Sequence, residues 1–204
     1  MSDERITHRK IGNALSDRLA YPETWMRTVY RAPLLFWRLG FGPVMGRIVL
    51  VLSHIGRRTG KIRRTALEYH RYEGRIYVFS GWSRSDWFKN IQAEPRVTVQ
   101  TDQGSLRALA RVLQSSAEYV EAHRLIEHNW MVRSELSGLG IDTSLEGFVA
   151  NKDRLQIVTF DPTSEPTPPP LQADLNWVTP LALGAFGIGY LAGNQDSRPK
   201  HRWF

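Results

Sequence analysis

The fold is decided by the stretch Ile48–Tyr72, IVLVLSHIGRRTGKIRRTALEYHRY, in which two strand-like runs flank a basic turn. Ile48–Ile55 is rich in β-branched and aliphatic side chains and predicts a buried strand that ends at Gly56. Arg63–Tyr72 predicts a second strand, which makes Gly56–Lys61 the turn between them. A strand, a glycine-flanked turn and a second strand are typical of an antiparallel sheet.

Outside this unit, the chain predicts further strands that follow one another with few helices between them. Upstream, Tyr21–Arg47 is rich in aromatic and aliphatic residues and predicts a pair of helices kinked or split at Pro33. Downstream, the expected strands are Arg75–Ser80, Arg96–Thr101, Ser105–Leu113 and Leu155–Phe160, and the expected helices are Ser85–Ala93 and Ser115–Met131. Because regular helices do not alternate with the strands, a Rossmann fold is excluded. The pattern predicts an α+β protein, an antiparallel barrel or half-barrel with flanking helices.

The composition of the chain divides it into four segments. Residues 1–20 form a polar N-terminal segment, and residues 21–160 form the expected β-barrel domain. Residues 161–174 are rich in proline and predict an extended linker. The end of the chain, 175–204, opens with 19 uncharged residues, 175–193, which predict an apolar C-terminal helix. This run is marginal for a membrane span, so membrane anchoring and docking onto an apolar groove both stay open.

Charge and cysteine content limit the partners and the compartment. The 204 residues include no cysteine, which excludes disulfides and thiolate metal sites. The net charge of +7 favours an anionic partner: nucleic acid, anionic lipid, or a phosphorylated or carboxylated small molecule. The polar stretch Met1–Lys10 has no apolar core of a signal peptide. We therefore expect a cytoplasmic protein and leave attachment to the inner face of the cell membrane, through 175–193, open.

The basic turn is the densest chemical signal in the chain. Five of the eight residues from Arg57 to Arg64 are cationic, and glycines flank the turn. Such a turn can aim backbone N–H groups and guanidinium groups at one anion, whereas a solvated basic hairpin is the plain alternative. It is not a phosphate-binding loop of the Walker type, because only three residues separate Gly56 from Gly60 and Ile62 follows Lys61.

A second signal lies at the end of the strand Arg75–Ser80 and in the helix that follows. Small residues in Phe79–Ser83 (FSGWS) would let a flat ring approach the backbone, and Trp82 and Trp87 could wall an aromatic ligand. Core packing of Trp87 and Phe88, with Asn90 as a helix cap, is the alternative.

Motifs for a metal or a nucleophile are missing from the sequence. His123 and His128 are five residues apart, which is wrong for a helical zinc pair, and there is no G-x-S-x-G elbow. His54 is expected to be a strand residue near the site and not a base. We expect no metal site, and the catalytic residues stay unknown.

Three segments together resemble the deazaflavin-dependent nitroreductase and quinone reductase family. They are Leu52–Leu67 (LSHIGRRTGKIRRTAL), Val78–Trp82 (VFSGW) and Asp86–Val99 (DWFKNIQAEPRVTV). The resemblance covers about Trp25–Phe160 and implies a split β-barrel of the flavin-reductase type that uses coenzyme F420. It also raises the prospect of a homodimer.

The resemblance implies a set of cofactor-binding residues. In that family the basic turn and the following arginine hold the phosphate and oligoglutamate tail of the cofactor, while the next strand residues, a strand end and a helix lie against the ring. The tail contacts would fall on Arg57, Arg58, Thr59 and Arg63, and the remaining contacts on Arg64, Thr65, Ala66, Leu67, Phe79, Ser80, Gly81, Trp82, Trp87, Phe88 and Asn90. A lysine that contacts the coenzyme in some relatives, after the third strand, is missing here. A tyrosine that some relatives place over the substrate has no clear counterpart in Tyr119–Trp130, so the acceptor pocket is not transferred.

The function implied by the resemblance is hydride transfer from reduced coenzyme F420 to a small electrophilic acceptor, a quinone or a nitro compound. A deazaflavin carries the hydride itself, so the protein needs no nucleophile of its own. A flavin mononucleotide enzyme on the same barrel is the alternative. A module that binds nucleic acid or anionic lipid would instead show steep salt dependence. Because the cations concentrate in one turn and do not spread over a face, nucleic acid is not expected.

Overall fold

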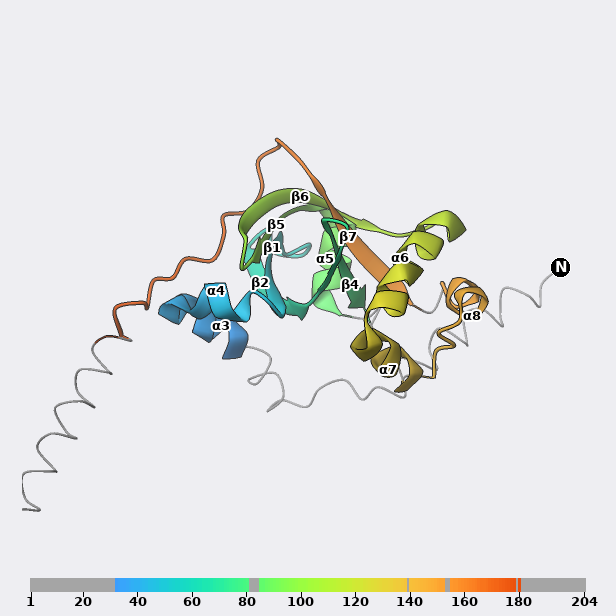
Figure 1. Ribbon diagram of the computed structural model, residues 1–204. Helices are drawn as coiled ribbons and strands as arrows, with labels where there is room; N and C mark the ends of the chain where they lie inside the picture. The colour runs from blue at the N-terminus through green and yellow to red at the C-terminus, as the bar shows by residue number, and fades with distance from the viewer. Residues whose placement is uncertain (1–31, 81–84, 139, 153–154, 179, 181–204) are drawn as a thin grey trace, which may run out of the picture.

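The computed structural model describes residues 32–80, 85–138, 140–152, 155–178 and 180 and contains one seven-stranded antiparallel sheet. The strand order is β2-β1-β5-β6-β7-β4-β3. The sheet curls into a half-barrel, so that β2 at one end contacts β4 near the other (Figure 1). The strands are β1 Val49–Ile55, β2 Ile62–Glu68, β3 His70–Tyr72, β4 Arg75–Ser80, β5 Arg96–Thr101, β6 Gly104–Val112 and β7 Gln156–Pro162. The predicted antiparallel sheet with flanking helices is confirmed.

The prediction of a single strand over Arg63–Tyr72 is wrong in one respect, because the structure has two strands there. β2 pairs with β1 over its whole length, whereas β3 pairs with β4. Tyr69 lies between them and is buried, and its hydroxyl group donates a hydrogen bond of 2.6 Å to the carbonyl oxygen of Gly46. This anchored residue separates the two pairings, which makes seven strands where about six were expected.

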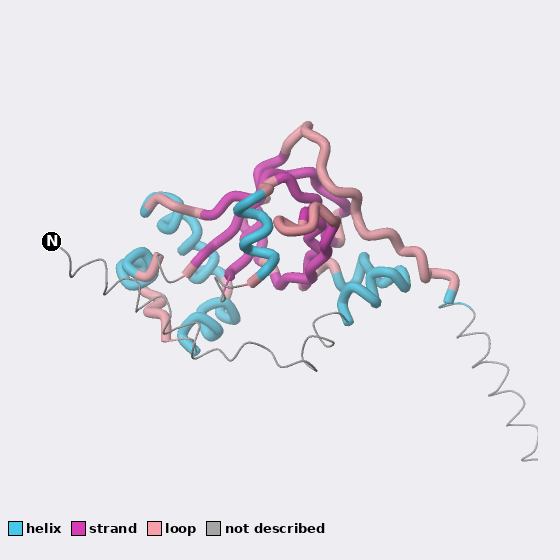
Figure 2. The backbone as a smooth tube through the Cα atoms, turned by 180° about the vertical axis from the view of Figure 1, so that it is seen from behind, coloured by secondary structure: helices cyan, strands magenta, loops and turns pink. Residues whose placement is uncertain are grey.

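Two hydrophobic clusters lie on opposite faces of the sheet. Leu50, Leu52 and Val78 belong to the cluster inside the curl, together with Phe88 and Ile91 from helix α5 (Asp86–Ala93). Seen from behind, α5 lies across the strands (Figure 2). The second cluster joins the outer face of β4 and β7 to helices α6 (Ser116–His128), α7 (Trp130–Gly138) and α8 (Leu145–Ala150).

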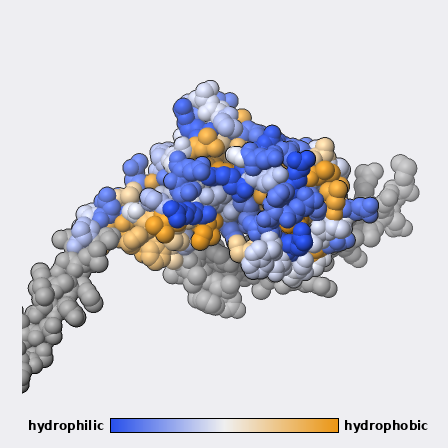
Figure 3. Space-filling view, viewed as in Figure 1, coloured by the Kyte–Doolittle hydropathy of each residue, from blue (hydrophilic) through white to orange (hydrophobic). Residues whose placement is uncertain are grey.

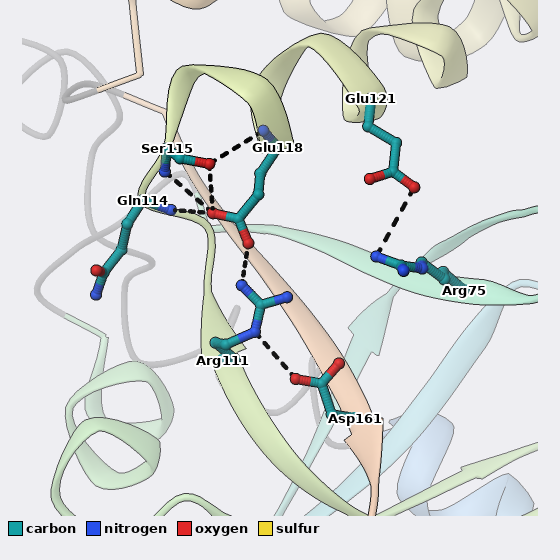
Figure 4. A network of polar contacts seen from close by, with 7 residues as sticks. All are labelled: Arg75, Arg111, Gln114, Ser115, Glu118, Glu121 and Asp161. Atoms are coloured by element: carbon teal, nitrogen blue, oxygen red, sulfur yellow. Dashed lines mark hydrogen bonds and ion pairs between the residues drawn. The ribbon is translucent and has the colours of Figure 1, made fainter.

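Helix α6 is fixed to the sheet by polar contacts at its first turn (Figure 4). Ser115 and Glu118 form a capping box, and the Glu118 carboxylate also pairs with Arg111 of β6. Arg111 in turn bonds Asp161 of β7 at 2.9 Å. The prediction that this helix reaches Met131 is wrong. It ends at His128 because Asn129 is extended, and the side-chain oxygen of Asn129 accepts the N–H of Met131 at the start of α7.

The N-terminal part of the described chain contains α3 (Ala32–Phe36), η1 (Trp37–Phe41) and α4 (Gly42–Met45). Pro33 lies in α3, next to its first described residue, so the predicted kink or split at Pro33 involves residues outside the described part of the chain. Within the described residues, a break lies at Gly40, whose φ of 92° favours glycine. Exposed apolar side chains gather over these short helices (Figure 3), among them Leu35, Phe36 and Val44. The rest of the predicted helix pair lies outside the described residues.

The proline-rich segment after β7 has no helix or strand, and it lies against the sheet (Figure 1). The Gln100 side chain bonds both backbone groups of Leu171, at 2.6 Å to its N–H and 3.1 Å to its carbonyl oxygen. Thr98 bonds the hydroxyl group of Thr167 and the carbonyl oxygen of Pro168. The predicted apolar C-terminal helix lies almost entirely outside the described residues. Among the helices that the structure describes, none has the length and hydrophobicity that a membrane crossing requires.

Candidate functional site

A groove of about 610 Å³ lies where the basic turn meets the start of α5. The turn follows β1, and α5 packs against β1 from inside the curl, so residues distant in sequence share one wall. The lining residues come from the end of β1, the turn, β2 and the first turns of α5: His54, Gly56, Arg57, Arg58, Thr59, Arg63, Arg64, Thr65, Ser85, Asp86, Trp87 and Asn90.

The backbone of the turn is closed by its own hydrogen bonds. The carbonyl oxygen of Gly56 accepts from the N–H of Gly60 at 2.8 Å and of Thr59 at 3.1 Å. Gly60 has a φ of 64°, a conformation that favours glycine. In this turn Arg58 is exposed, as is Arg63 at the start of β2, and neither has an ion-pair partner among the described residues. Two unpaired guanidinium groups therefore face one groove.

Arg57 differs from Arg58 and Arg63, because it ties the turn to α5. Its guanidinium group donates to the Asp86 carboxylate at 2.9 Å and to the side-chain oxygen of Asn90 at 2.9 Å. Its backbone N–H reaches the same Asn90 oxygen at 3.1 Å. The hydrogen bond from Arg57 is the largest influence that lowers the pKa of Asp86 below its usual value. Arg57 lines the groove, but its charge is already partly neutralised.

Behind the turn, the polar contacts continue into the protein interior. Asn90 Nδ2 lies 3.3 Å from His54 Nδ1, and His54 Nε2 lies 3.3 Å from the hydroxyl oxygen of Thr65. The His54 side chain is 2% exposed. Burial lowers the pKa of His54 to about 4, with the Arg63 charge acting in the same direction and a backbone contact with Ile55 opposing both. His54 is therefore neutral at neutral pH.

The strand alternation of β2 separates the four β2 residues that the resemblance implies as ring contacts. Thr65 and Leu67 lie on the same face as His54, because Leu52 pairs with Thr65 and His54 pairs with Arg63. Arg64 and Ala66 belong to the other face. The Arg64 guanidinium group lies 3.5 Å from the carbonyl oxygens of Pro169 and Pro170. It lines the groove, but it also contacts the C-terminal segment.

The remaining predicted residues divide between groove and core. Trp87 and Asn90 line the groove, whereas Phe88 is buried in the core, as the packing alternative holds. Phe79 packs toward the helices on the outer face, 5.5 Å from the ring of His70. Ser80 is buried; Ser80, Ala66 and Leu67 do not line this groove. Gly81 and Trp82 lie outside the described residues.

Sequence reasoning placed His54 near the site without its hydrogen-bond partners, and it missed Ser85 and Asp86 as parts of the groove. Ser85 precedes α5 as its N-cap residue, but its hydroxyl group caps nothing and is buried without a partner among the described residues. Asp86 was recognisable only as a possible helix start. The signal for His54 was a histidine within the apolar run Ile48–Ile55, where a buried polar group needs hydrogen-bond partners.

A comparison with models of known protein families gives one match. The family model described as F420H(2)-dependent quinone reductase matches residues 39–144. No curated protein matches the chain.

The chain is also similar, over part of its length, to solved structures. An F420-H2 dependent reductase, FDR-A, is 18% identical over 56% of this chain and 95% of its own, with a TM-score of 0.35. An FAD-binding protein from Mesorhizobium loti is 17% identical over 57% of this chain and 80% of its own, with a TM-score of 0.37. General stress protein 26 from Bacillus anthracis is 14% identical over 63% and 88%, with a TM-score of 0.37.

Proposed function

Since the chain belongs to the F420H(2)-dependent quinone reductase family, we propose that the groove between the basic turn and α5 holds coenzyme F420. The family consists of oxidoreductases, so the chain transfers a hydride from the reduced cofactor to a quinone-type acceptor. The cofactor supplies the hydride, and the task of the protein is to bind, orient and shield it from water. A nitro compound is a second acceptor of the same electrophilic kind.

The observation that carries the placement of the cofactor is the unpaired charge on Arg58 and Arg63. The tail of this cofactor is polyanionic, with a phosphate and carboxylates, and guanidinium groups bind both kinds of anion through paired hydrogen bonds. Arg57 holds the turn against α5 and keeps these two side chains at the groove. The residues present therefore fit the tail of the cofactor.

The inner end of the groove suits the ring of the cofactor. Trp87 and Thr65 line it, which gives an aromatic wall and a hydroxyl group next to a buried neutral histidine. A flat heteroaromatic ring can pack on tryptophan while its polar edge takes a hydrogen bond. Flavin mononucleotide remains the alternative ligand, but it has a single phosphate and would use less of the basic turn.

The proposal is tested by titrating the purified protein with coenzyme F420, and separately with flavin mononucleotide, while tryptophan fluorescence is followed. We expect Arg63→Ala to weaken F420 binding about tenfold, because one charge-assisted contact is lost. Arg107→Ala is the matched control, since Arg107 is exposed on β6 and does not line the groove. Absence of binding to either cofactor by the wild type would overturn the function, and unchanged binding by Arg63→Ala would overturn the site.

We further propose that the chain attaches to the inner face of a membrane, where a lipophilic quinone would be met. The support is the position of the segment that leads to 175–193. The N–H of Leu175 bonds the carbonyl oxygen of Arg38 at 2.9 Å, and Arg38 also pairs with Asp174 at 2.8 Å. The uncharged segment therefore starts beside the exposed apolar side chains of α3 and α4.

A homodimer is a separate proposal, which sedimentation velocity would test.

A further inference from the structure

A continuous set of polar contacts runs from the surface into the core behind the groove. It begins at the exposed Asp86 carboxylate and passes through Arg57, Asn90 and His54 to the hydroxyl group of Thr65. The contacts of Arg57 explain why the turn is held against α5. They do not explain why β1 buries a histidine beside Thr65.

The directions of these hydrogen bonds can be assigned by starting from Arg57, whose N–H groups can only donate. Arg57 offers N–H groups from its backbone and from its guanidinium group, and both reach the same Asn90 side-chain atom, at 3.1 and 2.9 Å. That atom must therefore be the amide oxygen, which turns the amide NH₂ group toward His54. Because an NH₂ group only donates, His54 Nδ1 is the acceptor and carries no hydrogen.

The tautomer of His54 then decides the role of Thr65. A neutral imidazole without a hydrogen on Nδ1 has it on Nε2, and Nε2 lies 3.3 Å from Thr65 Oγ1. His54 therefore donates to the Thr65 oxygen, and the hydroxyl hydrogen of Thr65 is left for another acceptor. Thr65 lines the groove and has no second hydrogen-bond partner within the part of the chain that the structure describes.

We propose that His54 is a positioning residue that fixes the Thr65 hydroxyl group as a hydrogen-bond donor into the groove, toward a carbonyl oxygen of the bound deazaflavin ring. The proposal rests on the function proposed above for the ligand, but the His54–Thr65 arrangement is a property of the protein without ligand. The burial of His54 supports it, because a residue that is 2% exposed keeps the neutral form on which the tautomer depends.

The arrangement is tested first in the protein alone. Long-range ¹H–¹⁵N NMR spectra distinguish imidazole tautomers, and the His54 signals are assigned among those of the six histidines by their loss in His54→Gln. We expect hydrogen on Nε2 and none on Nδ1 at pH 7. The opposite tautomer, with the hydrogen on Nδ1 and none on Nε2, would overturn the inference whatever the ligand is.

The role in binding is tested by a double-mutant cycle with coenzyme F420. We expect Thr65→Val to weaken binding about fivefold to tenfold, as for the loss of one hydrogen bond, and Thr65→Ser to restore it. His54→Leu should weaken binding similarly, and the double variant should be no weaker than Thr65→Val alone, because both changes remove the same contact. Thr159→Val, a buried change on β7 outside the groove, is the control and should bind like the wild type.

A second variant, His54→Gln, keeps the test valid if His54→Leu does not fold. His54→Gln keeps an NH₂ group near the position of Nε2, so it should retain a donor for Thr65 and bind F420 within about twofold of the wild type. If the wild type binds F420 and Thr65→Val binds it equally well, this inference is overturned while the proposed function stands. If the wild type binds no F420, the proposed function is overturned, and the NMR result alone decides the His54–Thr65 arrangement.

Discussion

At the scale of the residue, His54 affects how stability depends on pH, because a titratable ring is held neutral in the core. The burial that lowers its pKa from 6.5 to about 4 acts on the folded state only. Between these two values the unfolded chain takes up a proton that the folded chain does not. The free energy of unfolding therefore falls as the pH falls from 6.5 toward 4. The gap corresponds to about 3 kcal/mol at about 1.4 kcal/mol per pKa unit.

We predict that this loss of stability is absent in His54→Gln, which cannot titrate. Urea unfolding of both proteins at pH 7, 5.5 and 4.5 measures it. Carboxylates such as Glu94 and Glu118, whose pKa is lowered from 4.5 to about 2, lose their stabilising effect only at lower pH and are present in both proteins. Equal losses of stability in the wild type and the variant between pH 7 and 5.5 would contradict the prediction.

The residues of the groove show how far the site can be predicted from sequence. The basic turn was predictable because its charge density and glycines are local features, and Arg58 and Arg63 do share the groove. The interaction of Arg57 with Asn90 was not predictable, because it depends on how α5 packs against β1. A histidine inside an apolar strand indicates a buried hydrogen-bonded group, but the sequence does not name its partners.

At the scale of the element, the proline-rich segment after β7 lies over a face of the sheet, at the central strand β5, which already pairs with β1 and β6. Proline removes backbone donors, so the segment cannot form a regular strand and bonds the sheet through side chains of β5. The Gln100 amide holds it there, because it accepts from the N–H of Leu171 and donates to its carbonyl oxygen. Composition predicts only that such a segment is extended; its position depends on polar side chains elsewhere in the chain.

We predict that Gln100→Ala releases this segment without unfolding the sheet. Two hydrogen bonds are lost from a side chain that is 6% exposed, which corresponds to about 1–3 kcal/mol of unfolding free energy. Hydrogen exchange followed by mass spectrometry should show faster exchange in residues 163–173. Gln103→Ala, at an exposed turn, serves as the control. If exchange in this segment is the same in Gln100→Ala and in the wild type, the contacts with Leu171 do not hold it.

The strands were more predictable than the helices, for a physical reason. Local features predicted both bounds: a run of β-branched and aromatic residues after a turn for β4, and alternation of apolar and polar residues for β5. The helices α7 and α8 are short, and packing against α6 and β7 stabilises them, which periodicity alone does not reveal. The break between β2 and β3 likewise depends on the distant partner of Tyr69 at Gly46.

At the scale of the whole molecule, the basic groove and the apolar surface are separate features with different expected partners. The groove carries the unpaired cations of the turn, whereas α3 and α4 present apolar side chains beside the start of 175–193. Exposed apolar groups that lie together indicate a contact surface more strongly than the same groups scattered over a protein. Joined to an uncharged segment, this surface is the part of the molecule expected to meet lipid.

The last prediction separates these two surfaces by vesicle flotation of the full chain. We expect the wild type to float with vesicles of neutral phosphatidylcholine, since apolar burial drives the attachment, and more strongly when anionic phosphatidylglycerol is added, since the net charge is +7. Phe186→Asp with Ile188→Asp should abolish flotation with both vesicles, because charges in an apolar segment oppose insertion.

Two further variants test the structural part of this prediction. Phe36→Asp with Val44→Asp, both exposed over α3 and α4, should reduce flotation several-fold, since apolar burial contributes roughly 25 cal/mol per Å². Trp130→Asp is the matched control, because Trp130 is 76% exposed but lies on α7. An equal loss of flotation in this control would mean that the surface beside 175–193 is not the lipid contact. A wild type that floats with neither kind of vesicle would contradict membrane attachment, while the groove and its cofactor chemistry would be unaffected.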